Sequence, residues 1–234
     1  MNIRLDAIGE SLVYAIKYLP ETLKLIFIPL TIGLFIGTVT ALIRVYRTPV
    51  LSQFLALFIT IYQGIPIVVA LFLYNILYLM KFNDILEALH ITKTIADIDS
   101  IWIGIFALTM SAVCTISEVM RGALLSIDKG QNEAGFSAGL TKVQIVRRII
   151  LPQVVPVAIP PLVNSIVGLI KGSSIVYVIG IAEVLSGALI PSARRYTFFE
   201  GYLAAALVYW GLTIIIEKLG TLIEEHLGKF RRSL

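Results

Sequence analysis

Long apolar runs, separated by short polar segments, restrict the possible folds of this chain more than any other feature. The first run, from about Glu21 to Ile43, already has the ~20 residues that a helix needs to cross the hydrocarbon core of a bilayer. Only 15% of the residues are charged and 58% are hydrophobic, whereas charged residues make up about 25% of a typical soluble domain. We therefore expect an all-α membrane protein, because a spanning helix satisfies its own backbone groups in hydrocarbon.

The apolar runs and the charges between them predict five transmembrane helices. The later spans are expected at about Phe54 to Met80, Trp102 to Leu125, Val154 to Ile170 and Phe198 to Ile216. Lys and Arg follow the first, third and last spans, whereas the segment 81–100 has four acidic residues against two lysines. Because Lys and Arg gather on the cytoplasmic side, we expect the N-terminus outside and the C-terminus inside.

The apolar stretch after Pro152 is long enough for one span or for two. Two full spans between Val154 and Leu189 would place the basic C-terminal tail outside, against the tendency of Lys and Arg to stay inside. We therefore expect the segment from Ser174 to Leu189 to dip back or to pack as a broken segment.

Residues 1–19 mix charged and apolar side chains at helical spacing. They lack the compact apolar run of a signal peptide, so we predict an N-terminal helix that lies on a surface. Further along, Gly33 and Gly37 place two small residues on one face of the first span, which suits close contact with another helix. The whole chain, 1–234, is expected to form a single transmembrane domain.

A polar segment, 126–152, interrupts the apolar runs. Asp128 is a suitable cap for a first short helix, and Gly139 can adopt the left-handed conformation that ends it. Thr141 with Gln144 three residues later forms the capping-box pattern for a second helix, which we expect to end at Leu151, before Pro152. The segment is predicted to be a rigid hairpin that another protein can bind.

Glu133-Ala134-Gly135, Gly139, Ile149 and Leu151-Pro152 have the spacing of the EAA loop, and the chain resembles the permease subunits of bacterial ABC importers. In that family the loop docks into a groove on a cytoplasmic ATPase; on physical grounds the alternative is an amphipathic helix lying on the bilayer. Gly135 replaces the usual alanine, which weakens the helix by about 1 kcal/mol. The resemblance implicates in ATPase coupling Gln131, Glu133, Ala134, Gly135, Ala138, Gly139, Leu140, Ile149 and Pro152.

Polar residues in or beside the predicted spans are candidates for a transport path, because they are costly in hydrocarbon. The segment 63–66 (QGIP) resembles the RGTP segment of polar amino-acid permeases, and 171–174 (KGSS) resembles their KDTS segment without its acid. The candidates are Gln63, Glu118, Asn164, Lys171, Ser173, Ser174 and Glu183.

Other interpretations of these residues stay open. Gln63 suits a packing role beside a Gly-Pro kink, and Glu118 suits a local ion pair with Arg121. Lys171 has lost its adjacent acid, so Glu183, another subunit or a substrate carboxylate is expected to neutralise it. Prolines at 152, 156 and 160 share one helix face, which predicts either carbonyls freed toward a cavity or a merely kinked helix.

The resemblance implies the type I permease fold and an importer of polar amino acids in the bacterial cell membrane, with the cystine branch as the candidate subfamily. Its partners would be ATPase subunits, an extracytoplasmic binding protein and a second permease. No phosphate-binding loop motif occurs, so ATP and magnesium are expected on the separate ATPase, with no cofactor on this chain and no enzymatic activity of its own.

Other classes of function are less consistent with the sequence. Basic residues beside the spans fit orientation in a bilayer and not nucleic-acid binding. One cysteine, Cys114, and two distant histidines exclude the common metal motifs. An ion-driven secondary transporter is the alternative, with Glu118 or Glu183 as its carboxylate, although the chain has no internal repeat.

Overall fold

The computed structural model describes residues 3–88, 90, 92, 98–128 and 130–231, with only the backbone beyond 227. Every regular element in this part of the chain is helical. The elements are α1 (Leu5–Lys17), α2 (Leu19–Val45), α3 (Leu51–Gln63), α4 (Ile67–Ala88), α5 (Ile101–Leu125), α6 (Gly130–Ser137), α7 (Lys142–Ile145), the π-helix η2 (Val146–Ile150), α8 (Leu151–Ser173), the 3₁₀-helix η3 (Ser174–Ile179), α9 (Val184–Arg195) and α10 (Phe198–Arg231).

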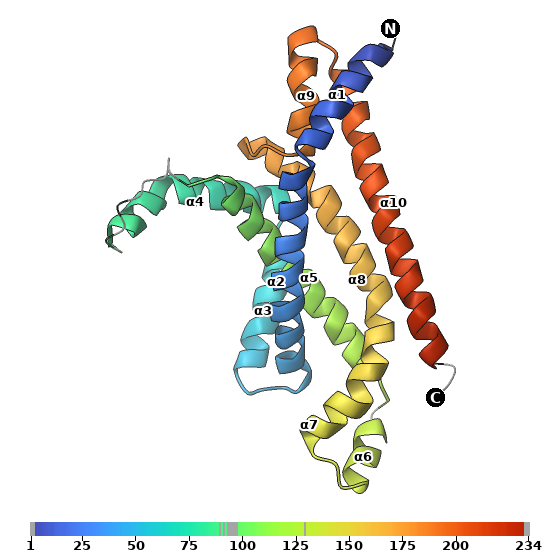
Figure 1. Cartoon of the computed structure of the whole chain (residues 1–234). Coiled ribbons are helices and arrows are strands. Elements are labelled where there is room, and N and C mark those ends of the chain that lie inside the picture. The colour runs from blue at the N-terminus through green and yellow to red at the C-terminus, as the bar shows by residue number, and fades with distance from the viewer. Residues whose placement is uncertain (1–2, 89, 91, 93–97, 129, 232–234) are drawn as a thin grey trace.

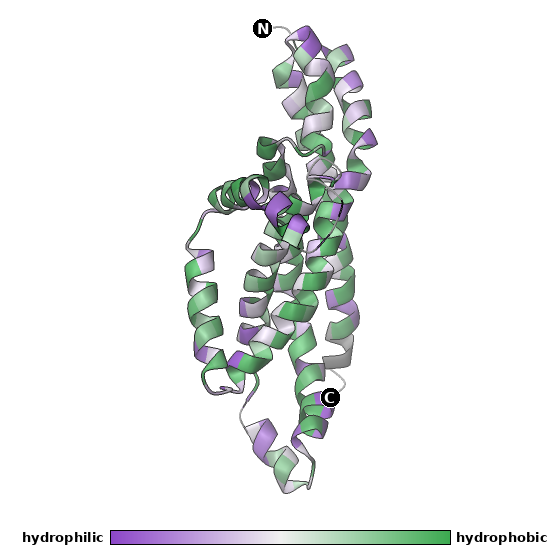
Figure 2. Ribbon diagram, turned by 90° about the vertical axis from the view of Figure 1, so that its left-hand side faces the viewer, coloured by the Kyte–Doolittle hydropathy of each residue, from purple (hydrophilic) through white to green (hydrophobic). Residues whose placement is uncertain are grey.

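Five helical segments of the described chain are long and apolar enough to cross a membrane, which confirms the predicted all-α, five-span architecture. They are Leu19–Val45, Ile67–Ala88, Ile101–Leu125, Lys142–Ile179 and Phe198–Leu227. α2, α5, α8 and α10 form the bundle, and α4 extends away from it to one side (Figure 1). Figure 2 shows apolar residues along the bundle and more hydrophilic residues at its two ends.

The predicted single span from Phe54 to Met80 is wrong, because two helices occupy this region. α3 and α4 are separated at Gly64-Ile65-Pro66, and the amides of Gly64 and Ile65 close the end of α3 on the carbonyls of Ile61 and Tyr62. Proline disfavours helical geometry in the residue before it and has no N–H to continue the ladder. α3, with 13 residues, is shorter than a membrane span requires.

The most extensive helix contact in the described chain is that between α2 and α5, and it is a close one. A Cβ added to Gly33 would lie 2.8 Å from Cβ of Ala112, and one added to Gly37 would lie 3.0 Å from the carbonyl oxygen of Val113. The small residues of α2 therefore face α5 and let the two backbones approach closely, as in other membrane helix pairs.

α7, η2 and α8 follow one another without a break, so the predicted end of the second hairpin helix at Leu151 is wrong. The amide of Leu151 donates to the carbonyl of Val146, five residues earlier. Pro152 has no amide hydrogen, and its ring crowds the carbonyl four residues before it. The wider π-turn accommodates this proline, so the helix continues into α8, which also contains Pro156, Pro160 and Pro161.

The segment after α8 does not cross the membrane a second time. η3 ends at Gly180, which has φ 81°, and α9 then packs against α1 and α10 at the end of the bundle that carries the N-terminus (Figure 1). This confirms the prediction that Ser174 to Leu189 packs as a broken segment. α9 is so close to α1 that a Cβ on Gly187 would lie 2.9 Å from the carbonyl oxygen of Tyr14.

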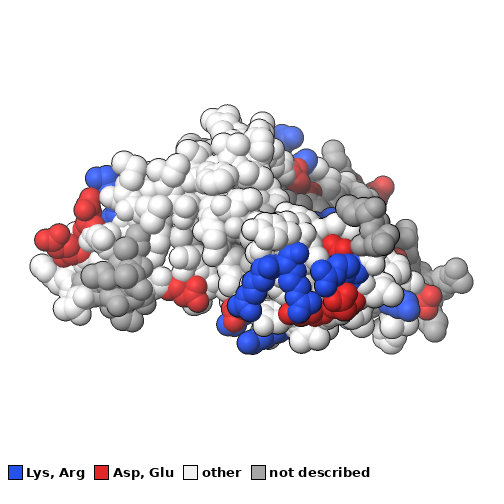
Figure 3. Space-filling view, turned by 90° about the horizontal axis from the view of Figure 1, so that it is seen from above, with Lys and Arg blue, Asp and Glu red and all other residues white. Residues whose placement is uncertain are grey.

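The predicted N-terminal helix is α1, and the structure places it against α9 and α10. It buries Ala7, Ser11 and Ala15 there, and Oγ of Ser11 lies 3.3 Å from Oγ of Ser192 on α9. Figure 3 looks onto this end of the molecule and shows basic and acidic side chains side by side. Between α9 and α1, Arg195 forms an ion pair of 2.9 Å with Glu10.

Candidate coupling hairpin and membrane cavity

The first half of the hairpin begins and ends as its sequence predicts. Oδ1 of Asp128 accepts a hydrogen bond of 2.6 Å from the amide of Gly130 at the start of α6. At the other end Gly139 has φ 77°. The amides of Gly139 and Leu140 donate to the carbonyls of Phe136 (2.9 Å) and Gly135 (3.0 Å), which is the Schellman arrangement of a helix C-terminus.

The second half begins with the predicted capping box. The amide of Thr141 donates to Oε1 of Gln144 at 2.8 Å, and the amide of Gln144 donates to Oγ1 of Thr141 at 3.4 Å. These two bonds satisfy amides that the first turn of α7 leaves free. Local hydrogen bonds therefore fix both sides of the turn between α6 and α7. The hairpin consequently has a defined shape and is not an open loop.

A large apolar side chain packs between the two halves of the hairpin. Ile145 of α7 is fully buried and lies over Gly135 of α6. A Cβ added to Gly135 would lie 2.6 Å from Cγ1 of Ile145 and 2.9 Å from its Cδ1. Glycine at this position, where the resembled loop pattern has alanine, thus leaves the space that isoleucine fills.

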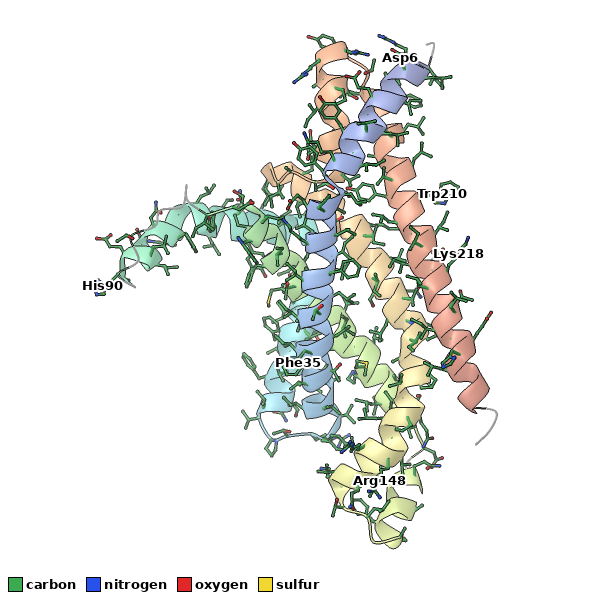
Figure 4. The ribbon with its side chains drawn as sticks, in the orientation of Figure 1. Asp6, Phe35, His90, Arg148, Trp210 and Lys218 are labelled. Atoms are coloured by element: carbon green, nitrogen blue, oxygen red, sulfur yellow. The ribbon has the colours of Figure 1, made fainter. Side chains whose placement is uncertain are left out.

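Most of the predicted coupling residues lie on the outside of the hairpin. Leu140 and Ile149 are half-buried against the main core, and Gly135 is buried. The exposed ones are Gln131, Glu133, Ala134, Ala138, Gly139 and Pro152. Phe136 and Val143 are also exposed, at 55% and 76%, and sequence reasoning missed them although apolar residues are unusual in so polar a segment. Figure 4 shows the hairpin residue Arg148 at the opposite end of the molecule from Asp6.

A cavity of about 320 Å³ lies between α5 and α8. Its polar lining residues are Ser111, Thr115, Asn164 and Ser165, and the remaining lining residues are Ile67, Leu108, Ala112, Ile116, Gly168, Leu169 and Gly172. Ser165 donates to the carbonyl of Pro161 at 2.9 Å. Ser111, Thr115 and Asn164 have no hydrogen bond to any residue that the structure describes, so they are free to bind water or a solute.

Of the predicted path residues, only Asn164 lines this cavity. Gln63 and Lys171 are exposed. Ser173 and Ser174 donate to the carbonyls of Ile170 and Lys171, both at 2.7 Å. None of the prolines of α8 lines this cavity, so the cavity gives no support to the prediction that they free carbonyls toward one. The structure therefore does not bring the other candidates together with Asn164.

Glu118 lies in an ion-pair cluster near the hairpin end of α5. Its Oε2 accepts from Arg121 at 2.8 and 2.9 Å, which is the local pair that the spacing allowed. Its Oε1 accepts from Arg44 at the end of α2, a partner that sequence reasoning missed because the two residues are 74 positions apart. Glu118 does not line the cavity.

Glu183 caps α9 and is fully buried. Its carboxylate accepts from the amides of Leu185 (2.8 Å) and Ser186 (3.1 Å) and from the hydroxyl of Tyr209 on α10. Burial raises the pKa of this carboxyl, and these hydrogen bonds oppose the increase. Within the described chain Glu183 forms no ion pair with Lys171, so it is not the neutralising partner considered from the sequence.

Five helices long and apolar enough to cross a membrane, a structured polar hairpin at one end and a cavity between the helices that flank it are consistent with a multi-pass membrane protein that transports solutes. Residues 30–229 match the family described as binding-protein-dependent transport system inner membrane component, and the chain belongs to this family. It is thus the membrane-embedded part of a transport system.

Individual relatives agree with this assignment. The chain is 33% identical to the probable amino-acid ABC transporter permease PatM of Vibrio harveyi, over 94% of each chain. It is 35% identical to the probable amino-acid permease YxeN of Bacillus subtilis, over 92% of this chain and 91% of that one. A solved structure described as an amino acid ABC transporter with histidines superimposes with a TM-score of 0.78 and 28% identity, over 97% of this chain and 100% of that chain.

Proposed function

We propose that this chain is the permease subunit of an ATP-driven importer of polar amino acids, and that it couples to a separate ATPase through the hairpin at 128–152. The main support is that α5 and α8, which supply every lining residue of the cavity except Ile67 of α4, are the same two helices that the hairpin joins. A force applied to the hairpin therefore acts directly on the walls of the cavity. ATP and magnesium would be held by the ATPase.

The cavity is the proposed transport path. Asn164 offers both hydrogen-bond donors and an acceptor, and Ser111 and Thr115 lie one helical turn apart on α5. Together they suit the polar groups of a small solute. Lys171 does not line the cavity, but it directly precedes the cavity residue Gly172 and is available to a substrate carboxylate.

The remaining partners follow from the same proposal. A substrate-binding protein would meet the charged end formed by α1 and α9, and a second permease, identical or related, would complete the path. Cystine is one candidate substrate among polar amino acids, because the long N-terminal segment and overall pattern resemble permeases for sulphur amino acids.

Reconstitution tests the proposal. Proteoliposomes containing this chain, its neighbouring ATPase and its binding protein are expected to hydrolyse ATP and to take up a labelled amino acid from a panel of cystine, arginine, histidine and glutamine. Uptake that requires all components supports the proposal and identifies the substrate. ATP-independent uptake by this chain alone contradicts it and favours an ion-driven carrier.

Two substitutions test the hairpin itself. Glu133→Lys reverses a charge on the exposed face of α6, and Gly139→Pro fixes φ near −65° where the turn requires 77°. Both are expected to abolish uptake while the amount of protein in the membrane stays the same. Glu224→Lys reverses an exposed charge on α10 and serves as the matched control. Normal uptake by both hairpin variants would refute the docking role.

A further inference from the structure

The hairpin has a contact with α2, although the chain connects it only to α5 and α8. Nζ of Lys142, the first residue of α7, lies 4.4 Å from the ring centroid of Tyr46, which directly follows the last residue of α2. A cation over the face of an aromatic ring within about 6 Å is attracted to it. The end of α2 is therefore held by the hairpin itself.

A second contact lies two residues earlier, on the last turn of α2. The guanidinium of Arg44 donates to Oε1 of Glu118 on α5, and only 11% of the Arg44 side chain is exposed. Arg121 holds the other carboxylate oxygen. The end of α2 is thus bound both to the hairpin and to the part of α5 that leads into the hairpin.

The rest of α2 packs closely against α5, so the two helices are expected to move together. Backbone atoms of α5 lie only 3.0 and 3.1 Å from where a Cβ on Gly37 would be, so no side chain separates the two helices. Tightly packed elements of this kind shift as units and do not deform gradually. A displacement applied at the end of α2 is consequently carried along its length.

We propose that Arg44 and Tyr46 are positioning residues that pass movement of the hairpin to α2. We call the set Arg44, Tyr46, Glu118 and Lys142 the α2 bridge. The bridge rests on the function proposed above and adds to it a third helix that the hairpin moves, beside α5 and α8. Without the bridge, the hairpin still docks and the ATPase still closes, but movement of the hairpin reaches the end of α2 only indirectly, through the packing of α2 on α5.

Loss of the bridge should therefore lower the amount of substrate moved per ATP hydrolysed. The test uses the complete complex in proteoliposomes and measures ATP hydrolysis and uptake in the same vesicles. Tyr46→Leu removes the ring, and Arg44→Gln removes the charge that binds Glu118. Each is expected to lower the ratio of uptake to hydrolysis roughly fivefold, the factor by which a contact of this strength shifts an equilibrium.

Conservative variants separate a positioning role from a merely structural one. Tyr46→Phe keeps the ring and Arg44→Lys keeps the charge, so both should retain the wild-type ratio. Because Tyr46 and Lys142 act through one contact, Tyr46→Leu combined with Lys142→Gln should lower the ratio no further than Tyr46→Leu alone.

Each other outcome overturns a specific claim. An unchanged ratio in Tyr46→Leu and Arg44→Gln, or an equal loss of uptake and hydrolysis, refutes the α2 bridge while leaving the proposed function intact. Wild-type complexes whose uptake does not depend on ATP refute the proposed function, and the bridge with it.

Discussion

Gly135 illustrates how one residue in the hairpin depends on its neighbour. Alanine is usually favoured over glycine inside a helix by about 1 kcal/mol. Here the added methyl group would lie 2.6 Å from Cγ1 of Ile145, which is fully buried. Overpacking of this kind costs about 1–3 kcal/mol. The unfavourable contact is therefore expected to outweigh the gain in helix propensity.

We predict that Gly135→Ala loosens the hairpin. The amides of Gly139 and Leu140, which close α6, should exchange with deuterium up to about tenfold faster, since 1.4 kcal/mol of local stability corresponds to that factor. Gly122→Ala is the control, because no atom lies within 4 Å of its added methyl group, and hairpin exchange should not change. Slower exchange in Gly135→Ala would show that Ile145 moves aside readily.

At the scale of whole helices, the close packing of α2 on α5 determines how much a substitution of glycine by alanine changes the stability of the protein. Gly37 faces the backbone of α5, whereas Gly211 of α10 has no atom within 4 Å of its added Cβ. The same change to alanine therefore has opposite effects at the two positions. At Gly37 it pushes two helices apart, and at Gly211 it only improves helix propensity.

We predict that Gly37→Ala lowers the unfolding temperature of the detergent-solubilised protein, while Gly211→Ala leaves it unchanged or raises it. Cys114, the only cysteine and a buried one, reports unfolding through its reaction with a thiol-specific dye during heating. Equal unfolding temperatures in the two variants would mean that α2 and α5 separate without cost.

Local signals made some of these elements predictable from the sequence. The caps at Asp128, Gly139 and Thr141 are made by residues close to one another in the sequence. The shape of the hairpin was therefore predictable from its own segment. The number of spans follows from hydropathy together with the positions of Lys and Arg, although the second span begins later than predicted, at Ile67. The continuation through Pro152 was not predictable in this way, because the π-turn that accommodates the proline has no strong sequence signature.

The candidate site was less predictable, because it depends on packing between distant segments. Asn164 was found as a polar residue within a span, but Ser111 and Thr115 were missed; serine and threonine often bond to their own helix, so they carry little signal. The Arg44 partner of Glu118 and the Tyr46 contact of Lys142 connect residues far apart in the chain. Only the assembled bundle reveals them.

The molecule as a whole has two dissimilar ends. At one end α1 and α9 form a charged layer with the N-terminus, and at the other the hairpin lies near the C-terminal end of α10 (Figure 1). The charge distribution in the sequence predicts that the hairpin end is cytoplasmic. This orientation is also what docking to a cytoplasmic ATPase requires, so the topology and the proposed function depend on each other.

Two matched cysteines test the orientation in a Cys114→Ser background. Ala193 at the end of α9 and Ala138 at the end of α6 are both exposed alanines, one at each end of the molecule. A membrane-impermeant maleimide should label Ala193→Cys in intact spheroplasts that express this chain without its ATPase, and should label Ala138→Cys only in inside-out vesicles. The result follows because a charged reagent does not cross the hydrocarbon core, so each cysteine reports the side on which its end lies. The reverse pattern would place the hairpin outside, where no cytoplasmic ATPase can reach it, and would contradict both the orientation and the docking role.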